Sequence, residues 1–300
     1  MKVLIVGAYG QLGRELLGSA PPQFEIQAAG REICDIRDAA AVKRCVDRCR
    51  PGLIINAAGY TAMDRAETER EAAYDVNAIG AGRLAVAAEE CGARLIHIST
   101  DYVFDGTKST PYLRDDDPRP VNIYGKSKLE GERRIARTLG PQALIVRTAW
   151  LYATHGRNFV TSMLGLMRER EETRVVCDQI GSPTWARGLA CALWQAAVRP
   201  GLHGVYHWTD AGVASWYDLA VAIQEEALAL GLLERPGNVV PIRTDEYPMP
   251  ARRPAYTVLD KSDTWRDFGV SAGYWRNALR EMLKEVLRTA KDEPNQKGAH

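Results

Sequence analysis

The sequence has little of what marks secreted, membrane or nucleic-acid-binding proteins. Its six cysteines, at positions 34, 45, 49, 91, 177 and 191, are scattered through apolar periodic segments, so we expect them to be reduced and buried. Cys45 and Cys49 share a predicted helix face without a nearby histidine, which predicts no metal site. The net charge is only +1, with acids and bases interleaved, and this predicts neither nucleic acid nor an anionic membrane as partner.

Long apolar runs are also missing. No stretch approaches the roughly 18 residues that a membrane span needs, and the first apolar stretch breaks at Gly7 after five apolar residues, which is not the pattern of a secretion signal. We therefore expect a cytoplasmic protein, and 300 residues are enough for one large or two modest cores.

What the first half does contain is a regular alternation of strand and helix patterns. Apolar runs rich in β-forming residues predict strands over 2–6, 25–29, 53–56, 94–98 and 143–147. Helices are expected from Asp38 to just before Pro51, over 69–91 and around 124–128. This alternation predicts an α/β fold with a Rossmann-type, doubly wound parallel sheet. Ligands bind beyond the carboxyl ends of such strands, where Gly7, Ala57, Thr100 and Thr148 fall.

The second half is less regular and predicts a smaller, partly irregular substrate-binding domain. Strands are expected over 175–177 and 205–208, and helices over 186–199, 215–230 and 275–289, with 236–254 irregular. Ser215 and Asp218 have the spacing of a capping box. We expect a dinucleotide-binding domain over 1–150, with an added strand and helix from about 185–215. Residues 151–288 would mainly bind substrate, and 289–300 would form a flexible tail.

A glycine-rich turn follows the first strand. The sequence from Gly7 through Gly10 to Gly13 has the spacing G-x-x-G-x-x-G and runs into a helical pattern. Glycines at a strand–helix turn let the backbone approach a pyrophosphate, which then rests on the helix N-terminus. This predicts dinucleotide binding by Gly7, Gly10, Gln11 and Leu12, although a purely structural turn has the same pattern.

The end of the second strand bears on the choice of cofactor. Arg31 stands where NAD-preferring sites usually place an acidic residue, and an arginine suits a ribose 2′-phosphate. We therefore predict NADPH, with NADH accepted as well. Asp35 is expected on the adenine side. The alternative is that Arg31 is an ordinary solvated arginine.

Tyr124 and Lys128 form a candidate acid/base pair. Positions i and i+4 share a helix face, so the ammonium group can lie beneath the phenol. A free phenol has a pKa near ~10, and a neighbouring cation lowers it by roughly 1–3 units, which favours proton exchange near neutral pH. The competing interpretation is chance spacing on a solvated helix face.

Taken together, these motifs resemble the extended short-chain dehydrogenase/reductase superfamily and, within it, the dTDP-4-dehydrorhamnose reductase family. The resemblance covers residues 1 to about 288. The general elements are the glycine turn, Asn56-Ala-Ala, Ser99-Thr-Asp-Tyr-Val-Phe, Tyr124-x-x-x-Lys128 and Arg147-Thr-Ala-Trp150. The more particular ones are residues 56–64, 102–106, 158–160, 178–184 (DQIGSPT) and 250–254 (PARRP).

The resemblance implies reduction of the C4 ketone of a dTDP-linked 6-deoxyhexose by NADPH. Tyr124 would be the general acid, Lys128 would lower its pKa and hold the nicotinamide ribose, and Thr100 would hydrogen-bond the carbonyl oxygen. A hydroxyl at a strand end can equally bond its own backbone, which is the alternative for Thr100.

The resemblance also implies further binding residues. Ala57, Ala58, Tyr60, Asn77 and Tyr102 would lie at the cofactor, and Tyr102, Trp150, Asn158 and Arg253 at the nucleotide sugar. Arg252 and Arg253 could bind the diphosphate. Some of these residues have a structural alternative: core packing for Trp150, a capped or surface position for Asn77, and a stabilising pair with the acidic loop of residues 115–117 for Arg252 and Arg253.

Some members of this family form dimers through magnesium held by glutamates. Glu15 fits one such position, but Arg187 stands where another carboxylate is expected, which argues against magnesium here and leaves a monomer or a homodimer. Two other functions stay open: a non-catalytic regulatory subunit like the methionine adenosyltransferase β subunit, or another nucleotide-sugar reductase or epimerase.

Overall fold

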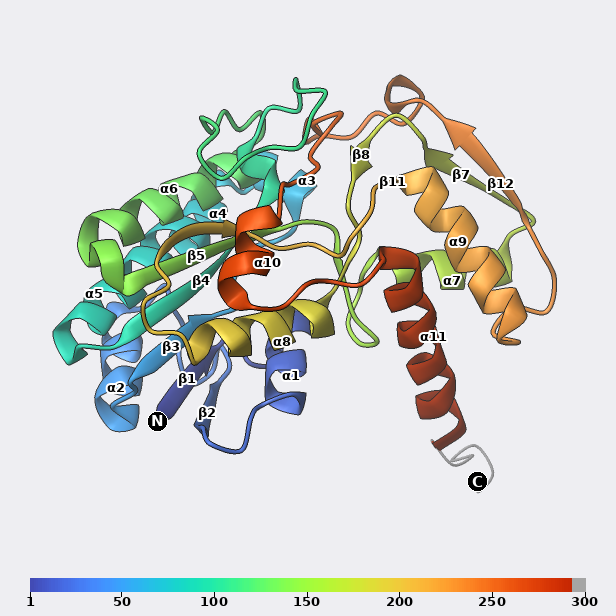
Figure 1. Ribbon diagram of the computed structural model, residues 1–300. Coiled ribbons are helices and arrows are strands. Elements are labelled where there is room, and N and C mark those ends of the chain that lie inside the picture. The colour runs from blue at the N-terminus through green and yellow to red at the C-terminus, as the bar shows by residue number, and fades with distance from the viewer. Residues whose placement is uncertain (293–300) are drawn as a thin grey trace, which may run out of the picture.

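The computed structural model describes residues 1–292, and a parallel sheet forms its centre (Figure 1). Six strands of the described chain pair in the order β10-β5-β4-β3-β1-β2. They are β1 (Lys2–Val6), β2 (Glu25–Ala29), β3 (Leu53–Asn56), β4 (Arg94–Thr100), β5 (Ala143–Thr148) and β10 (Gly204–His207). Every residue of β3 and β5 is buried, as expected for strands covered on both faces. The predicted Rossmann-type fold is confirmed.

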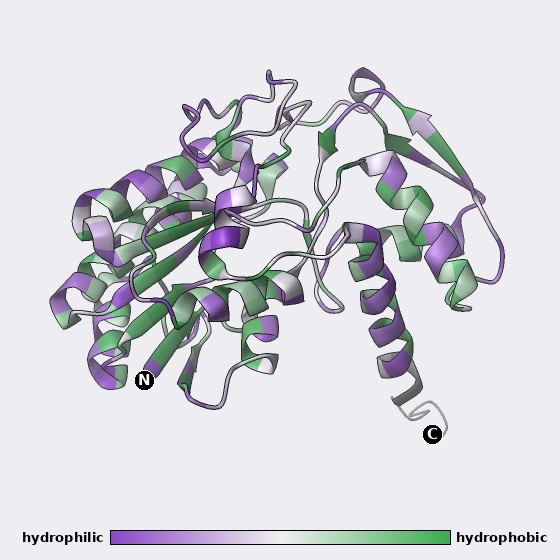
Figure 2. Cartoon of the chain, in the orientation of Figure 1, coloured by the Kyte–Doolittle hydropathy of each residue, from purple (hydrophilic) through white to green (hydrophobic). Residues whose placement is uncertain are grey.

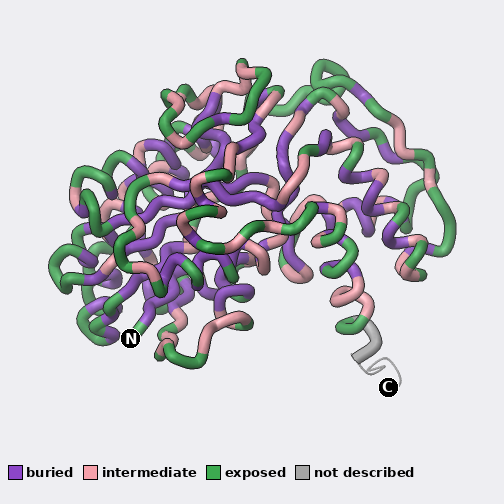
Figure 3. Tube along the Cα trace, in the orientation of Figure 1, coloured by how far each residue is buried: buried purple, intermediate pink, exposed green. Residues whose placement is uncertain are grey.

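Helices cover both faces of this sheet. On one face Leu4 and Ile54 pack with Leu84 against α2 (Ala39–Cys49), α5 (Ala81–Cys91) and α6 (Ile123–Leu139). On the other face Ile5 and Ile55 pack against α1 (Gln11–Gly18), α8 (Ala186–Ala197) and α10 (Ser262–Phe268). Successive residues of a strand thus pack into different hydrophobic cores, one on each face of the sheet. Figure 2 shows the strands as the apolar centre, and Figure 3 shows that they are buried beneath exposed outer loops.

A second lobe follows β5 and has its own core. Helices α7 (Phe159–Glu169), α9 (Trp216–Ala229) and α11 (Trp275–Asp292) pack through Leu164, Ile223 and Leu283. Beside them, β7 (Glu172–Val176) pairs in parallel with β12 (Asn238–Ile242). Short strands join the lobes: β6 (Leu151–Tyr152) pairs with β9 (Thr184–Trp185), and β8 (Ile180–Gly181) pairs with β11 (Ala214–Ser215).

The predicted capping box is confirmed, whereas several other expectations were wrong. Ser215 Oγ accepts from Asp218 N at 3.0 Å while Asp218 Oδ2 accepts from Ser215 N at 2.8 Å. The stretch 236–254 is not wholly irregular, because β12 lies in it. Cys91 and Cys191 are exposed rather than buried. Most of the expected tail lies outside the described residues, although α11 extends through Asp292.

The helix expected over 69–91 is interrupted. It consists of α4 (Arg70–Tyr74), a π-helical segment η1 (Asp75–Gly80) and α5, and is preceded by α3 (Met63–Thr68). Short 3-10 turns η2 (Asp101–Val103), η3 (Gly140–Gln142) and η4 (Thr244–Glu246) complete the described elements. Within residues 1–292, no helix has the length and apolar character that crossing a bilayer requires.

Candidate active site

A cavity of about 660 Å³ lies beyond the carboxyl ends of β1, β3, β4 and β5, a size typical of small-molecule sites. Residues of both lobes line it, including the glycine-rich turn, the β3 end, the β4 end, α6 and the start of α7. It therefore occupies the position where ligands bind in doubly wound sheets.

The glycine-rich turn forms one wall through close backbone packing. Gly7 has φ +78°, and a Cβ on it would lie 2.5 Å from Ala58 N. A Cβ on Gly13 would lie 2.3 Å from Gly7 O. At Gly10, which lines the cavity, a Cβ would meet only Gly7 O at 3.4 Å, so a side chain there would enter the open space. Helix α1 begins after Gly10 without a side-chain cap, and its first N–H groups are suited to phosphate oxygens.

Thr100, Tyr124 and Lys128 come from two neighbouring elements, and all three line the cavity. Thr100 ends β4, while the other two lie on the first turns of α6, which Asn122 caps by accepting from Gly125 N at 2.8 Å. A Cβ on Gly125 would lie 2.1 Å from Tyr102 O. Glycine at this position thus lets α6 approach η2 and brings Tyr124 beside Thr100.

The pKa of Tyr124 moves opposite to the sequence-based expectation. Desolvation in the cavity wall raises it to about 12, opposed by a hydrogen bond with Thr100. Lys128 does not lower it, because the ammonium group points to β4 and donates to Ile98 O at 2.5 Å. Burial lowers the pKa of Lys128 itself to about 8, with Glu132 acting in the other direction. Tyr124 is therefore protonated at neutral pH, as a general acid must be.

The other predicted residues divide into two groups. Those that line the cavity are Gly10, Gln11, Leu12, Ala57, Ala58, Tyr102, Trp150 and Asn158. Those that lie outside its lining are Gly7, Arg31, Asp35, Tyr60, Asn77 and Arg253.

Arg31 and Asp35 are held together near the β2 end. Arg31 Nε lies 3.5 Å from Asp35 Oδ2, and the arginine side chain is 74% exposed. Asp35 also pairs with Arg37 at 2.6 Å, and this hydrogen-bonded guanidinium lowers the pKa of the carboxyl. The ion pair between Arg31 and Asp35 is therefore long and exposed to solvent, so the Arg31 side chain can reorient toward a ligand.

The Asn77 side chain forms hydrogen bonds with backbone groups that lie outside the cavity lining. Its Oδ1 accepts from Tyr60 N at 2.8 Å, and its Nδ2 donates to Tyr60 O at 3.0 Å and to Ser127 Oγ at 3.0 Å. A single side chain in the π-helical segment thus joins the loop after β3 to the turn of α6 that carries Lys128. The Tyr60 hydroxyl donates to Glu69 Oε2 at 2.7 Å.

Arg253 forms a structural ion pair, but not with the acidic loop that the sequence suggested. Its two terminal nitrogens lie 3.1 and 2.8 Å from the Asp64 carboxylate. Arg252 is exposed, and its backbone oxygen accepts from Asn122 Nδ2 at 2.8 Å. The segment 250–254 is thereby fixed against the start of α6.

Sequence reasoning missed a second tryptophan in the cavity wall. Trp216, the first residue of α9, lines the cavity and stacks on Trp150 with ring centroids 3.5 Å apart and planes 5° apart. Trp150 has φ +48°, a conformation uncommon for a bulky residue. Its indole fits against Gly181, where a Cβ would lie 2.6 Å from it. The capping box predicted where α9 begins but did not indicate that its first side chain faces a ligand site.

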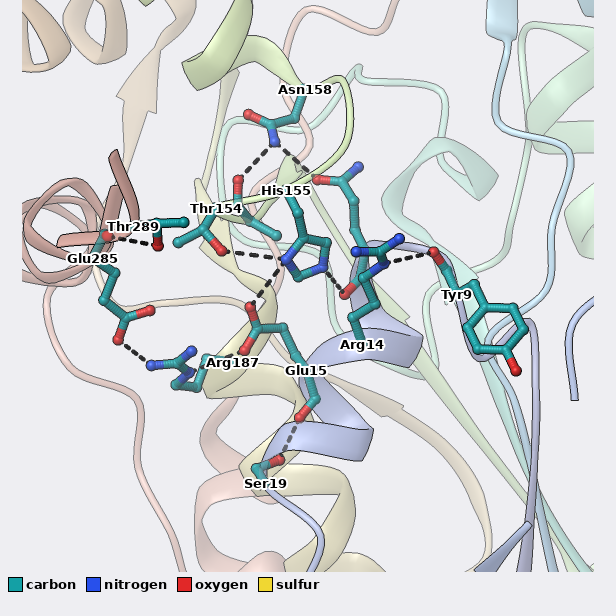
Figure 4. A network of polar contacts seen from close by, with 12 residues as sticks. Tyr9, Arg14, Glu15, Ser19, Thr154, His155, Asn158, Arg187, Glu285 and Thr289 are labelled. Carbon is teal, nitrogen blue, oxygen red and sulfur yellow. Dashed lines mark hydrogen bonds and ion pairs between the residues drawn. The ribbon is translucent and has the colours of Figure 1, made fainter. Parts of the chain in front are cut away.

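A polar network joins the two lobes, and part of it lines the cavity (Figure 4). His155 Nε2 contacts Gln11 O at 3.1 Å, and Asn158 Nδ2 donates to Gln11 Oε1 at 3.0 Å. In the same network, Arg187 Nε lies 3.0 Å from Glu15 Oε2, and its Nη1 pairs with Glu285. Arg187 thus supplies the positive charge between two glutamates. Among residues 1–292, no cluster of three or more His, Cys, Asp or Glu is arranged to hold a metal.

A doubly wound sheet with a glycine-rich turn facing a Thr–Tyr–Lys group defines the short-chain dehydrogenase/reductase class of Rossmann-type proteins. Residues 1–288 match the family described as "RmlD substrate binding domain". The chain therefore belongs to this family, that of the dTDP-4-dehydrorhamnose reductases.

Relatives with assigned activities are similar over almost the whole length. A dTDP-4-dehydrorhamnose reductase from Burkholderia thailandensis is 41% identical, with 96% of this chain and 99% of the relative covered. A dTDP-4-keto-6-deoxy-D-glucose reductase from Streptomyces niveus is 42% identical, with 93% and 95% covered. The crystal structure of dTDP-4-dehydrorhamnose reductase from Bacillus anthracis in complex with NADP superposes with a TM-score of 0.89 at 38% identity, covering 95% and 99%.

Proposed function

We propose that the protein reduces the C4 ketone of dTDP-4-dehydro-6-deoxy-L-mannose to dTDP-L-rhamnose with NADPH. The observation that carries this proposal is that Thr100, Tyr124 and Lys128 line the same cavity as the glycine-rich turn. The relatives' activities support the reaction, and the NADP in the Bacillus anthracis structure supports the cofactor.

The residues present fit a dinucleotide. Gly10, Gln11 and Leu12 would hold the pyrophosphate at the N-terminus of α1, and Ala57 and Ala58 would line the path toward Lys128. Arg31 would meet the 2′-phosphate by leaving its 3.5 Å contact with Asp35. When bound, NADPH supplies the hydride that reduces the carbonyl carbon.

Tyr124 would donate the proton that the ketone oxygen needs. Negative charge grows on this oxygen during reduction. The developing alkoxide is a stronger base than the phenolate of Tyr124, because the phenol has a pKa of about 12, and the proton therefore passes from Tyr124 to the alkoxide. Lys128 would hold the nicotinamide ribose of NADPH by hydrogen bonds to its hydroxyl oxygens. Thr100, whose hydroxyl oxygen lies 3.0 Å from Asp101 Oδ1, would turn its one O–H to the ketone oxygen as a second donor. Donors aimed where charge develops stabilise the transition state more than the substrate.

The second lobe would hold the nucleotide sugar. Trp150 and Trp216 offer a continuous aromatic wall, and Asn158 and Tyr102 add polar groups at the same cavity. Arg253, fixed by Asp64, would contribute positive charge near Tyr102 for the diphosphate. We place the enzyme in the cytoplasm as a monomer or homodimer, without nucleic-acid or membrane partners.

A related reductase activity is the second candidate. The relative from Streptomyces niveus is named for dTDP-4-keto-6-deoxy-D-glucose, which differs in the configuration of the hexose. A regulatory role without catalysis is disfavoured, because Thr100, Tyr124 and Lys128 are all retained around an open cavity.

The test is an assay of the purified protein on both enzymatically generated ketosugars, with NADPH and NADH side by side. We expect faster turnover of the L-mannose derivative with NADPH, and a rhamnose product identified by NMR. Tyr124→Phe should lose roughly 100-fold or more in kcat while NADPH binding, measured by fluorescence, persists. Unchanged turnover in Tyr124→Phe would contradict the proton-donor role.

A further inference from the structure

A buried polar chain runs from the cavity wall to Lys128. It consists of Asn56 at the end of β3, His97 in β4 and Lys128 in α6, which are 1%, 1% and 4% exposed. Ala58 N donates to Asn56 Oδ1 at 3.1 Å, Asn56 Nδ2 lies 2.9 Å from His97 Nδ1, and His97 Nε2 lies 3.4 Å from Lys128 Nζ. None of these contacts is used in the chemistry described above.

The contacts assign the hydrogens along this chain. Because the Ala58 N–H needs an acceptor, the oxygen of the Asn56 amide faces it, and the NH2 group faces the imidazole. His97 Nδ1 is then an acceptor. Burial holds the pKa of His97 well below its ordinary value, so the ring is neutral and its one proton is on Nε2. That N–H points at Lys128.

An ammonium group has three donors and no acceptor. When Lys128 is charged, an N–H group of the ammonium faces the Nε2–H group of His97, and two donors meet. An uncharged amine can instead accept a hydrogen bond from His97 Nε2–H. The groups that favour the charged form are Ile98 O in β4, at 2.5 Å, and Glu132 of the same helix, whose carboxylate is shared with Arg147 of β5 at 2.7 Å. Tyr124, one turn earlier on α6, is neutral. The charged and uncharged forms of Lys128 are therefore closer in free energy than for a lysine in water, in agreement with a Lys128 pKa of about 8.

We propose that the Asn56–His97 pair is a positioning device that keeps Lys128 partly uncharged until a bound dinucleotide offers it acceptor oxygens, so that NADPH binding takes up a proton. The proton passes from solvent to the amine, and no bond is otherwise made or broken. The inference rests on the contact between Lys128 and NADPH that the proposed function assumes. It makes Asn56 and His97 residues that act through Lys128 rather than catalytic groups.

Calorimetry in buffers of different ionisation enthalpy measures this proton directly. At pH 8, near the Lys128 pKa of about 8, we expect the wild type to take up about half a proton per NADPH bound. Its Kd should rise roughly tenfold between pH 8 and 9.5 by the same linkage. No uptake by the wild type would overturn the inference.

Two substitutions should replace the N–H group that faces Lys128 by a hydrogen-bond acceptor. In Asn56→Asp the carboxylate still accepts from Ala58 N but also accepts from His97, which moves the ring proton to Nδ1 and leaves Nε2 as an acceptor for the ammonium group. In His97→Gln the amide can rotate its oxygen toward Lys128. Both should reduce the uptake to below about 0.1 proton and limit the rise in Kd to less than about twofold. His207→Phe, a change of an equally buried histidine on β10, should behave like the wild type.

Uptake in both variants equal to that of the wild type would contradict the inference. If neither variant folds, the wild-type tautomer decides: 15N NMR of His97 should show an unprotonated Nδ1 and a protonated Nε2, and the opposite pattern would refute it. Lys128→Met separates this inference from the proposed function. NADPH binding of wild-type strength in Lys128→Met would refute the assumed contact, whereas weakened binding with unaltered uptake in Asn56→Asp would refute the inference alone.

Discussion

Trp216 lies flat against Trp150 in the cavity wall, with 3.5 Å between ring centroids. Trp150 directly follows β5 of the sheet and Trp216 begins α9, and both pack against the core of the second lobe. Trp216 also donates to Gln179 Oε1 at 3.2 Å, so its ring is fixed on both sides. The stack therefore lies where the chain leaves the sheet that carries Thr100 and enters the lobe that we expect to hold the sugar.

Trp216→Leu should weaken sugar binding specifically. Loss of a stacked aromatic contact is worth about 0.5–1.5 kcal/mol, so we expect KM for the nucleotide sugar to rise roughly 2- to 13-fold, with the Kd for NADPH changed less than about twofold. Trp265→Leu, outside the cavity lining, is the control. Equal effects of the two changes on KM would show that Trp216 acts only through stability.

Thr100→Val should lower kcat by about 10- to 100-fold because it removes one of two donors aimed at the developing charge. It also removes the hydrogen bond that opposes the rise in the pKa of Tyr124. The alkaline limb of the pH–kcat profile should therefore move to higher pH in this variant. Thr100→Ser, which keeps the hydroxyl, should retain most of the activity and the wild-type profile. A profile identical in all three proteins would contradict the Thr100–Tyr124 coupling.

Two glycines of α1 provide a matched pair. Gly13→Ala places a Cβ 2.3 Å from Gly7 O, whereas Gly18→Ala meets nothing within 4 Å. We expect Gly13→Ala to lower the free energy of unfolding by about 1–3 kcal/mol through overpacking and to weaken NADPH binding, since the turn must shift. Gly18→Ala should be neutral or stabilising by up to about 1 kcal/mol. Urea unfolding and NADPH titration measure both effects, and NADPH affinity unaffected by Gly13→Ala would contradict the role of the turn.

Arg187→Met should destabilise the protein by leaving Glu15, which is 4% exposed, without its cation. Because Arg187 is itself partly exposed, solvent screens the pair and we expect about 1–3 kcal/mol. The double variant Glu15→Gln/Arg187→Met should recover most of this loss, because Glu15, the more buried of the two glutamates that Arg187 contacts, then carries no charge. A double variant as unstable as Arg187→Met would show that packing, not charge, dominates.

Stability should depend on pH through Asp210. This carboxyl is 3% exposed, and burial raises its pKa to about 7. Between pH 4 and 7 the folded protein therefore binds more protons at this position than the unfolded chain, so the free energy of unfolding falls as pH rises through this range. Asp210→Asn should reduce the loss of stability between pH 5 and 8 by on the order of 2–4 kcal/mol. Urea denaturation at the two pH values tests this, and equal losses in both proteins would contradict it.

Much of the fold could be predicted from patterns of residues that lie close together in the sequence. The apolar runs of β1 and β3, the glycine spacing from Gly7 to Gly13 and the capping box at Ser215 are patterns of near neighbours, so they can be recognised before any tertiary contact is known. The i, i+4 spacing of Tyr124 and Lys128 likewise predicted a shared helix face.

Long-range contacts decided the rest. Strand β12 forms in a stretch that contains Pro241 because it pairs with β7, and the π-helical turn at Asn77 accommodates bonds to Tyr60 and Ser127. The pKa of Tyr124 rises rather than falls because desolvation depends on depth in the fold, which no spacing contains. The sequence alone determined which chemical groups the chain carries and the elements that carry them. Only the tertiary structure decided their solvation, their partners and therefore their charge, because these depend on residues distant in the chain that packing brings within a few ångströms.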